Sequence, residues 1–283
     1  MRRAKAAAAV MCAVLLSVPA TAQSRKLKPG INLFSREQDI QLGKEAARQI
    51  EKQIRLTEHQ EIQDYVERLG RRLASRPEAD KYPYFFKVVD DREINAFALP
   101  GGPVYINAGV ILAAENEAQL AGVMAHEISH VALRHGTNQV TKAHIVQLPA
   151  LLAGLAIGSD SLLGQLGQLG VGIGANSLLL KFSRGAERDA DLLGARLMSG
   201  AGYNPIEMAR FFEKLESGRA LRAPEFLSSH PNPGNRRRAV EQEIRYLPHR
   251  EYPLYNEEFV RIQRLVQEVS AKQNLTRGER QGR

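Results

Sequence analysis

Polar and apolar positions in the first third of the chain follow the period of an α-helix. Ser35, followed three residues later by Gln38, is typical of a capping box, and we expect a helix from there to about Ile54. Thr57 and Gln60 repeat the arrangement. Behind them, apolar residues at helical spacing predict a second amphipathic helix: Ile62, Tyr65, Val66, Leu69 and Leu73.

Three short apolar runs then predict strands. They cover Phe85–Val89, Asn95–Leu99 and Val104–Ile106, with a tight turn at Pro100-Gly101-Gly102 between the last two. Short strands joined in this way predict a small antiparallel sheet. A strand flanked by proline suits the edge of a sheet, because proline has no N–H to donate to a second neighbour.

The rest of the apolar pattern is helical. We expect a helix from Glu117 to about His135, ended by Gly136. Its apolar positions share one face: Leu120, Met124, Ile128 and Val131. Three further helices are expected, from Asn204 to Gly218, from Asn232 to about Leu247 and from Asn256 to about Lys272. The fold class should therefore be α+β, mainly α.

Residues 145–180 are rich in leucine and glycine. Their longest apolar stretch, Leu148 to Gly158, is shorter than the roughly 20 residues of a membrane span, and Asp160 interrupts it. Two interpretations stay open. The segment forms buried helices with a flexible connection, or it is a mobile lid or flap over a cleft that makes peripheral contact with a membrane.

The start of the chain has the layout of a secretory signal peptide. Arg2, Arg3 and Lys5 are basic, residues 6–18 form a short apolar run, and residues 20–22 are small. We expect residues 1–22 to be removed and the mature protein to be exported to the periplasm, either free or membrane-associated. The one cysteine, Cys12, lies in this segment, so the mature protein would tolerate an oxidising compartment without disulfides.

Composition and charge narrow the class of protein. Apolar residues make up 43% and charged residues 25%, which is the balance of a globular chain rather than a disordered one. The net charge of +8 falls to +5 without the basic start, and a mildly basic surface favours anionic membranes or acidic proteins. No basic motif interleaved with aromatic residues stands out, so we expect no nucleic-acid partner.

The candidate chemistry lies in the helix expected from Glu117. His126-Glu127-Ile128-Ser129-His130 matches the pattern H-E-x-x-H. Positions i and i+4 share a helix face, so both imidazoles can reach one metal ion. Glu127 lies about 100° round the helix, close enough to accept a proton from an attacking water without being a ligand. Two imidazoles, one carboxylate and one open position suit zinc, Zn²⁺, at one ion per chain.

A third ligand has to come from elsewhere in the chain. An extended motif would need a glycine and a histidine where this chain has Leu133 and Gly136. Glu187 is the best candidate, because it lies in a second helical stretch 57 residues after His130.

Neighbouring residues receive other interpretations. Asp191 lies four residues after Glu187, on the same helix face, and would accept a hydrogen bond from a ligand histidine. Asp189 is interpreted as a solvated acid. His135 is interpreted as a structural residue or a neighbour of a ligand.

With these residues in place, the chain resembles the Ste/HtpX-like gluzincin metallopeptidases (metallopeptidase family 48), and most of all their periplasmic branch. The resemblance runs from about Leu33 to Pro248. Its motifs, in order, are Asn95–Gly102, His126–His130 with His135, Glu187–Asp191, and Ser229-His230-Pro231 with Arg236. It implies one zincin-like metallopeptidase domain over residues 23–250, followed by a C-terminal helix and basic tail over residues 251–283.

The resemblance also implies roles. His126, His130 and Glu187 would bind zinc, and Glu127 would act as general base and acid. His230 would lie over the zinc and help to hold the oxyanion, with Arg236 nearby. From chemistry alone, His230 could equally flank a helix.

The substrate would be a polypeptide. The resemblance implies that an extended substrate adds to an edge strand through backbone hydrogen bonds. This strand contains Asn95, Ala96, Phe97 and Ala98. Proteins of the periplasmic branch carry a helical-repeat domain after the peptidase domain. About 35 residues follow Pro248 here, too few for the roughly three repeats of a stable array, so we expect no such domain.

Two functions from different classes follow. The first is a zinc-dependent endopeptidase that hydrolyses misfolded or unassembled exported and outer-membrane proteins, as part of envelope protein quality control. The alternative is a chaperone-like binding module that captures extended chains on its edge strand while the zinc site stays latent. A structural zinc site is disfavoured, since such sites more often use cysteines and the mature chain would have none.

Overall fold

The computed structural model describes residues 25–156, 181–218 and 224–281. The expected signal peptide lies outside these ranges, as does the part of the leucine- and glycine-rich segment from residue 157 to residue 180. Within the described ranges, no helix combines the length and apolar character that a membrane span requires.

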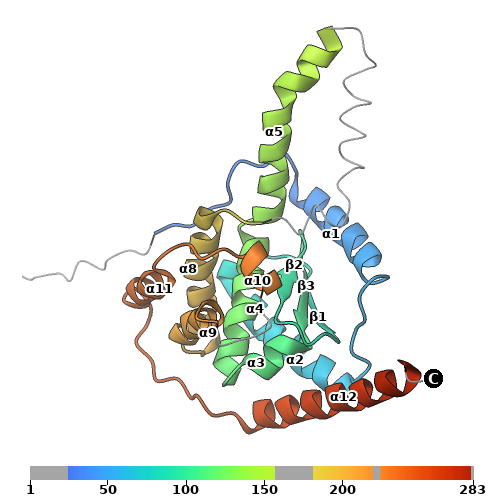
Figure 1. The fold of residues 1–283 in the computed structure, drawn as a ribbon. Helices are drawn as coiled ribbons and strands as arrows, with labels where there is room; N and C mark the ends of the chain where they lie inside the picture. Colours follow the sequence, from blue (N-terminus) through green and yellow to red (C-terminus); the bar gives the residue numbers. More distant parts are fainter. Residues whose placement is uncertain (1–24, 157–180, 219–223, 282–283) are drawn as a thin grey trace, which may run out of the picture.

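A three-stranded sheet lies beside the helices (Figure 1). It contains β1 (Phe85–Val89), β2 (Ala96–Ala98) and β3 (Pro103–Asn107), in the spatial order β1-β3-β2. The expectation of a purely antiparallel sheet was wrong, because β1 and β3 are parallel whereas β2 and β3 are antiparallel. The tight turn reverses the chain between β2 and β3, and β3 then inserts between β1 and β2 in the same direction as β1. Gly101 and Gly102 have φ angles of 76° and 130°, which glycine adopts without strain.

Helices make up most of the described chain. Their bounds are α1 Arg36–Ile50, α2 Gln60–Ala74, α3 Ala108–Ala113, α4 Glu117–Ala132, α5 His135–Ala156, α8 Arg184–Ala201, α9 Ile206–Glu216, α10 Pro224–Ser229, α11 Arg236–Ile244 and α12 Glu257–Gln281, with a 3₁₀ turn at Pro77–Ala79. The mainly α, α+β class is confirmed. In Figure 1, α5 leaves the body of the domain and α12 runs across its opposite end.

Two helix starts test the capping patterns. At α1, Ser35 accepts a hydrogen bond from the Gln38 amide and the Gln38 side chain accepts one from the Ser35 amide, so the capping box is confirmed. At α2 the prediction was wrong. The helix begins after His59, and the Thr57 hydroxyl accepts a hydrogen bond from the His59 amide before the helix starts.

The predicted end of α4 was also wrong. The helix stops at Ala132, and Gly136 lies in the first turn of α5 instead. Arg134 makes the break, with a φ angle of 55°, which is uncommon for a residue with a side chain. Its guanidinium Nε lies 2.6 Å from the buried carboxylate of Asp39, and this ion pair holds the unusual backbone in place.

The core is built around α4, whose residues from Ala118 to Ala132 are all buried. The helices α2, α8 and α9 and the strand β2 pack against it. Gly122 allows α9 to come close, since a Cβ atom there would lie 2.7 Å from the Cβ of Met208. A histidine or glutamate on α4 is therefore removed from water unless it lines a site.

Candidate metal centre

The two motif histidines of α4 lie one helical turn apart and point to the same place. Their Nε2 atoms are 3.0 Å apart, and both side chains are buried. This is the arrangement that the i, i+4 spacing predicts.

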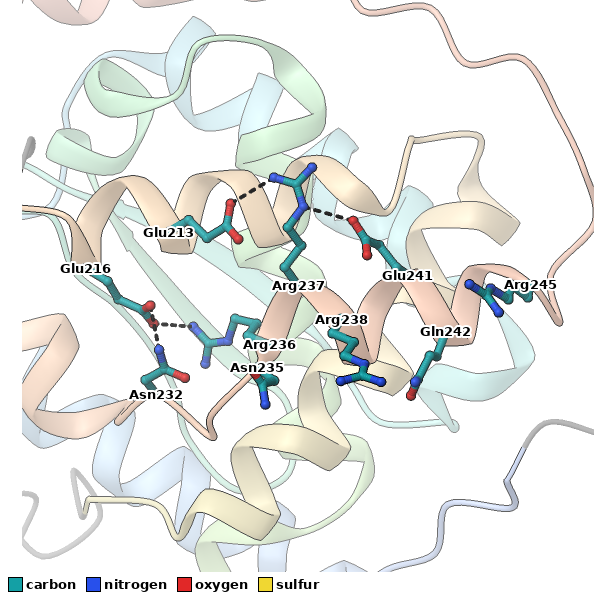
Figure 2. Close-up of a pocket in the computed structure, with 10 residues that line it drawn as sticks. All are labelled: Glu213, Glu216, Asn232, Asn235, Arg236, Arg237, Arg238, Glu241, Gln242 and Arg245. Carbon is teal, nitrogen blue, oxygen red and sulfur yellow. Dashed lines mark hydrogen bonds and ion pairs between the residues drawn. The ribbon is translucent and has the colours of Figure 1, made fainter.

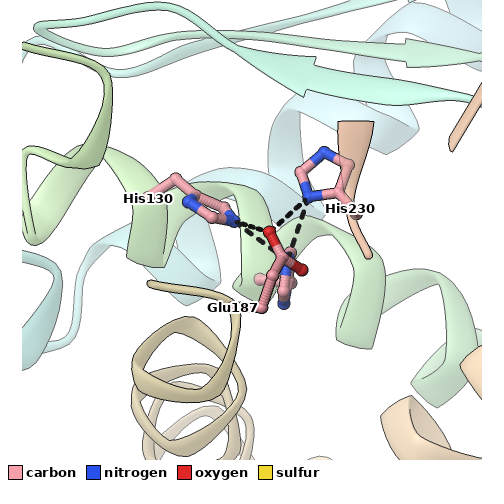
Figure 3. Close-up of side chains that lie close together, drawn as sticks. His130, Glu187 and His230 are labelled. Carbon is pink, nitrogen blue, oxygen red and sulfur yellow. Dashed lines mark hydrogen bonds and ion pairs between the residues drawn. The ribbon is translucent and has the colours of Figure 1, made fainter. Parts of the chain in front are cut away.

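Glu187 approaches from α8, whose first turn follows the N-cap residue Ser183. Its carboxylate oxygens lie 3.3 Å from His126 Nε2 and 3.4 Å from His130 Nε2. The first turn of a helix is a favourable place for this carboxylate, because the free N–H groups there carry partial positive charge. Figure 3 draws Glu187 between His130 and a third histidine, His230.

His230 completes the cluster from the chain after α10. Its Nδ1 atom lies 3.3 Å from His126 Nε2 and 3.2 Å from a Glu187 oxygen. Ligand atoms of His126, His130, Glu187 and His230 all lie within 4.8 Å of one another, so the group could hold a metal ion.

The four groups fit zinc in number, type and spacing. Ligand atoms about 2.0 Å from a tetrahedral zinc ion lie about 3.3 Å apart. Three imidazole nitrogens and one carboxylate are donors that zinc accepts. The distances from His126 to the other two histidines, and from Glu187 to all three, run from 3.0 to 3.4 Å, and the ligand atoms of the whole group lie within 4.8 Å of one another. One zinc ion per chain is consistent with this geometry.

Glu127 lies beside the cluster without belonging to it. The side chain is completely buried, and neither carboxylate oxygen has a hydrogen-bond partner within the described part of the chain. The Nε2 atom of His230 lies 3.5 Å from one of these oxygens. Burial raises the pKa of Glu127. A buried carboxylate with unused acceptors is costly, and it fits a group whose partner is a reacting water.

A second layer of polar groups holds the candidate ligands. Asp191 Oδ1 lies 3.0 Å from His126 Nδ1, as the sequence predicted, and leaves Nε2 free for a metal. Arg236 donates to Asp191 over 2.7 Å and to Glu187 over 3.2 Å. The guanidinium of Arg236 also lies over the ring of Phe212, 4.2 Å from its centroid.

Arg236 is buried, but it borders a depression in the surface of the domain. Figure 2 shows it at a polar depression of about 570 Å³ between α9 and α11. There Glu216 accepts a hydrogen bond from Asn232 over 2.6 Å, and its other oxygen lies 3.9 Å from Arg236 Nη1. The loop between His230 and Arg236 is therefore attached to α9 through Glu216.

The aromatic residues of the site were not predicted from the sequence. Phe182 stacks on His130 with ring centroids 3.9 Å apart, and Phe226 stacks on His230 at 4.6 Å. Both lie outside the motifs, in segments whose local pattern carries no signal of a site. The predicted residue His135 lies next to a candidate ligand, with its Nδ1 atom 2.9 Å from His130 Nδ1.

The predicted edge strand, β2, lies against α4 and forms one edge of the sheet. Asn95 and Leu99 make the backbone hydrogen bonds to β3. Bonding positions alternate along an antiparallel strand, so the amides and carbonyls of Ala96 and Ala98 face away from β3.

The opposite edge of the sheet is closed by side chains of α2. Gln63 donates to the carbonyl of Phe86 over 2.6 Å and accepts from the amide of Val88 over 3.1 Å. Glu67 accepts from the amide of Phe86 over 2.9 Å. These side chains occupy backbone groups of β1 that an added strand would need.

Protonation of the metal-free cluster is dominated by its carboxylates. Burial alone lowers the pKa of His126, but Glu187 and Asp191 outweigh it and raise the pKa to about 9. Burial holds the pKa of His130 well below its ordinary value. Near neutral pH, His126 of the metal-free site is therefore an imidazolium, with a proton on each ring nitrogen.

We expect zinc binding near pH 7.5 to release about one proton, because a ligand imidazole must be neutral. The raised pKa of His126 stabilises the metal-free fold below about pH 6.5, and this stabilisation is lost as the pH rises through about 9. The apparent zinc affinity should therefore rise from pH 6.5 to 9 and then level off. Calorimetry in buffers of different ionisation enthalpy measures the proton release, and a zinc affinity independent of pH over this range would contradict the prediction.

Comparison with known proteins agrees with the geometry. Residues 58–244 match the profile of Peptidase family M48. The chain is 33% identical over 205 residues to the beta-barrel assembly-enhancing protease of Escherichia coli (strain K12), a match that covers 70% of this chain and 42% of that protein. It is 29% identical over 248 residues to the protein of the same name from Yersinia pestis, covering 81% of this chain and 51% of the relative.

A mitochondrial relative is similar too. The mitochondrial metalloendopeptidase OMA1 of Schizosaccharomyces pombe is 32% identical over 180 residues, covering 63% of this chain and 52% of the relative. The chain thus spans about half the length of these curated relatives, or less.

Proposed function

Because the chain belongs to peptidase family M48, we propose that it is a zinc-dependent endopeptidase with His126, His130 and Glu187 as ligands and Glu127 as general base and acid. The observation that carries the proposal is the buried Glu127 carboxylate, which lacks a hydrogen-bond partner among the described residues and lies beside four candidate metal ligands. A structural metal site would have no use for this carboxylate.

The roles of the chain's own groups follow from their positions. When bound, zinc would act as a Lewis acid that polarises the peptide carbonyl and activates the attacking water. Glu127 accepts the proton of that water and passes a proton to the leaving amine, and its raised pKa suits both transfers. His230, whose Nε2 lies 3.5 Å from Glu127, would donate a hydrogen bond to the oxyanion from this side of the cluster. Asp191 and Arg236 orient His126 and Glu187.

The proposal is tested by measuring zinc content and casein cleavage on one preparation. We expect about one zinc ion per chain, and cleavage that a chelator stops and added zinc restores. A preparation that cannot bind zinc would overturn the proposal.

The outer edge of β2 is the proposed site for the substrate backbone. Proline at position 98 would remove an amide that faces away from β3 and lies near Glu127, so the sheet should persist while the substrate edge loses a donor. We expect Ala98→Pro to lower kcat/KM about tenfold or more, since each backbone hydrogen bond lost in a buried complex costs about 1–3 kcal/mol.

Ala98→Ser is the matched control, because serine keeps the amide and adds little volume. It should cleave casein at nearly the wild-type rate, and zinc content should be unchanged in both variants. Wild-type cleavage by Ala98→Pro would mean that substrates bind elsewhere.

We further propose that the substrates are misfolded or unassembled proteins of the cell envelope, including outer-membrane proteins. The signal-peptide pattern of residues 1–22 supports export to the periplasm, and the name of the Escherichia coli relative supports a link to β-barrel assembly. Peripheral membrane contact through residues 145–180 is part of this proposal. Limited proteolysis with and without lipid vesicles tests it, since contact should protect this segment only when lipid is present.

One observation favours a second function, the capture of extended chains on the edge strand while the zinc site stays latent. His230 enters the cluster through Nδ1, where it would act as a fourth ligand, and four protein ligands are typical of closed zinc sites. A protein that binds zinc and captures unfolded casein without cleaving it would fit this function and not the first.

A further inference from the structure

Two residues that are far apart in the sequence contact the same candidate ligand, His130. His135 is the first residue of α5, and Phe182 lies just before the N-cap residue of α8. His135 Nδ1 lies 2.9 Å from His130 Nδ1. The Phe182 ring lies against the His130 ring, with centroids 3.9 Å apart and planes 21° apart.

The contact with His135 determines which nitrogen of His130 is free. The Nε2 atom of His130 faces His126 and Glu187, so it is the atom that would bind a metal. A neutral imidazole then carries its proton on Nδ1, which makes His130 the donor and His135 Nδ1 the acceptor. The His135 side chain is buried, and its Nδ1 can accept when the ring proton lies on Nε2.

Hydrogen bonds connect the two contacts where the first turns of α5, from His135 to Gln139, meet Lys181 and Phe182. We call this contact the α5 base. The side-chain amide of Gln139, one turn into α5, donates to the carbonyl of Lys181. The amide of Phe182 donates to the carbonyl of Ser229 over 3.0 Å, next to His230. Movement of α5 relative to the chain at 181–182 would therefore disturb the His130 ring on both its Nδ1 side and its face.

We propose that His135 and Phe182 are positioning residues that hold His130 in its ligand orientation. Zinc affinity then depends on how the α5 base is packed. The inference rests on the proposed function only in taking His130 as a metal ligand. It gives His135, already interpreted as a possible neighbour of a ligand, a specific partner atom, and it adds Phe182, which no motif indicated.

The test is the rate of zinc loss from the zinc-loaded protein to a colorimetric chelator. We expect His135→Phe to speed zinc loss by about 10- to 100-fold, the usual effect of removing an outer hydrogen-bond partner of a ligand. His135→Asn should stay close to the wild type, because the asparagine oxygen can take the place of Nδ1 as acceptor. Phe182→Ala should speed zinc loss roughly 2- to 10-fold, and Phe182→Tyr should restore the slow rate.

His144→Phe is the matched control. It makes the same chemical change on the same helix, where the ring of His144 lies near that of Phe34 rather than near the metal ligands. Its zinc loss should match the wild type. If His135→Phe and His144→Phe lose zinc equally fast, the positioning role is wrong, even if the wild type binds zinc and cleaves casein.

A second measurement does not depend on any variant folding. If the packing of the α5 base affects zinc affinity, zinc must in turn affect that packing. Zinc should therefore slow amide hydrogen exchange in the first turn of α5 in the wild-type protein. Exchange there that is identical with and without zinc would overturn the inference, whereas failure to bind zinc at all would overturn the proposed function instead.

Discussion

Glu127→Gln is expected to reduce casein cleavage by about 10²- to 10⁴-fold while leaving one zinc ion bound per chain. General acid–base catalysis contributes a factor of this size. Glutamine has nearly the same shape as glutamate but accepts no proton in this pH range. Since Glu127 is not one of the four candidate ligands, the substitution removes the base and leaves the metal site intact. Replacing a buried, unpartnered carboxylate should not destabilise the fold either.

A matched control comes from the same helix. Glu117→Gln changes a glutamate in the first turn of α4, where the carboxylate accepts a hydrogen bond from Tyr203 over 3.2 Å, far along the helix from the metal centre. It should cleave casein like the wild type. Zinc in both proteins with cleavage only by the control would establish the role of Glu127. Equal cleavage by Glu127→Gln and the wild type would remove Glu127 from the mechanism.

The same variant separates the two candidate functions. A binding module does not need a general base, so capture of unfolded casein should survive in Glu127→Gln. If the wild type also captures casein without cleaving it, the latent site becomes the better description. The fourth candidate ligand, His230, would then be the first residue to examine.

Removing Glu187 is expected to have the largest effect on the metal. Glu187→Ala deletes the one carboxylate among the four candidate ligands, and we expect zinc affinity to fall by well over 100-fold, more than the loss of an outer partner causes. It also leaves the buried guanidinium of Arg236 with only Asp191 as a close partner at the site. Leaving a buried charge less well paired is destabilising, so the metal-free variant should also melt at a lower temperature.

Asp189→Ala provides the comparison on the same helix. Asp189 lies two residues further along α8, and its carboxylate is 3.6 Å from Arg25, with 26% of the side chain exposed. Competition with a zinc chelator measures both affinities. Asp189→Ala should bind zinc like the wild type, since a partly exposed ion pair contributes little. Equal losses in the two variants would mean that general acidity of α8, rather than a ligand at position 187, holds the metal.

Part of the site follows from local periodicity. His126 and His130 share a face because four residues make slightly more than one turn of any α-helix. The same argument places Glu187 and Asp191 together on α8, and both pairs point into one site. The capping box at Ser35 belongs to this class as well, since its partners are only three residues apart.

Other features lay beyond local pattern. Gly136 is typical of a residue that ends a helix, but α4 ends before Arg134. The backbone of Arg134 is stabilised there by an ion pair to Asp39, 95 residues away. The turns predict an antiparallel sheet. However, the last strand in sequence, β3, lies in the centre and pairs with β1 in parallel. Aromatic partners such as Phe182 carry no signal until the fold brings them to the site.

The sequence by itself therefore determined the mainly helical class, the H-E-x-x-H helix and the kind of metal that its side chains suit, because these depend on residues within about a turn of one another. Only the tertiary structure decided that His230 lies among the candidate ligands, that β2 is an edge strand and that His135 and Phe182 contact His130. His230 meets His126 across 104 positions of the chain. Contacts of this kind depend on how helices and strands bury their apolar faces together, which no short stretch of sequence specifies.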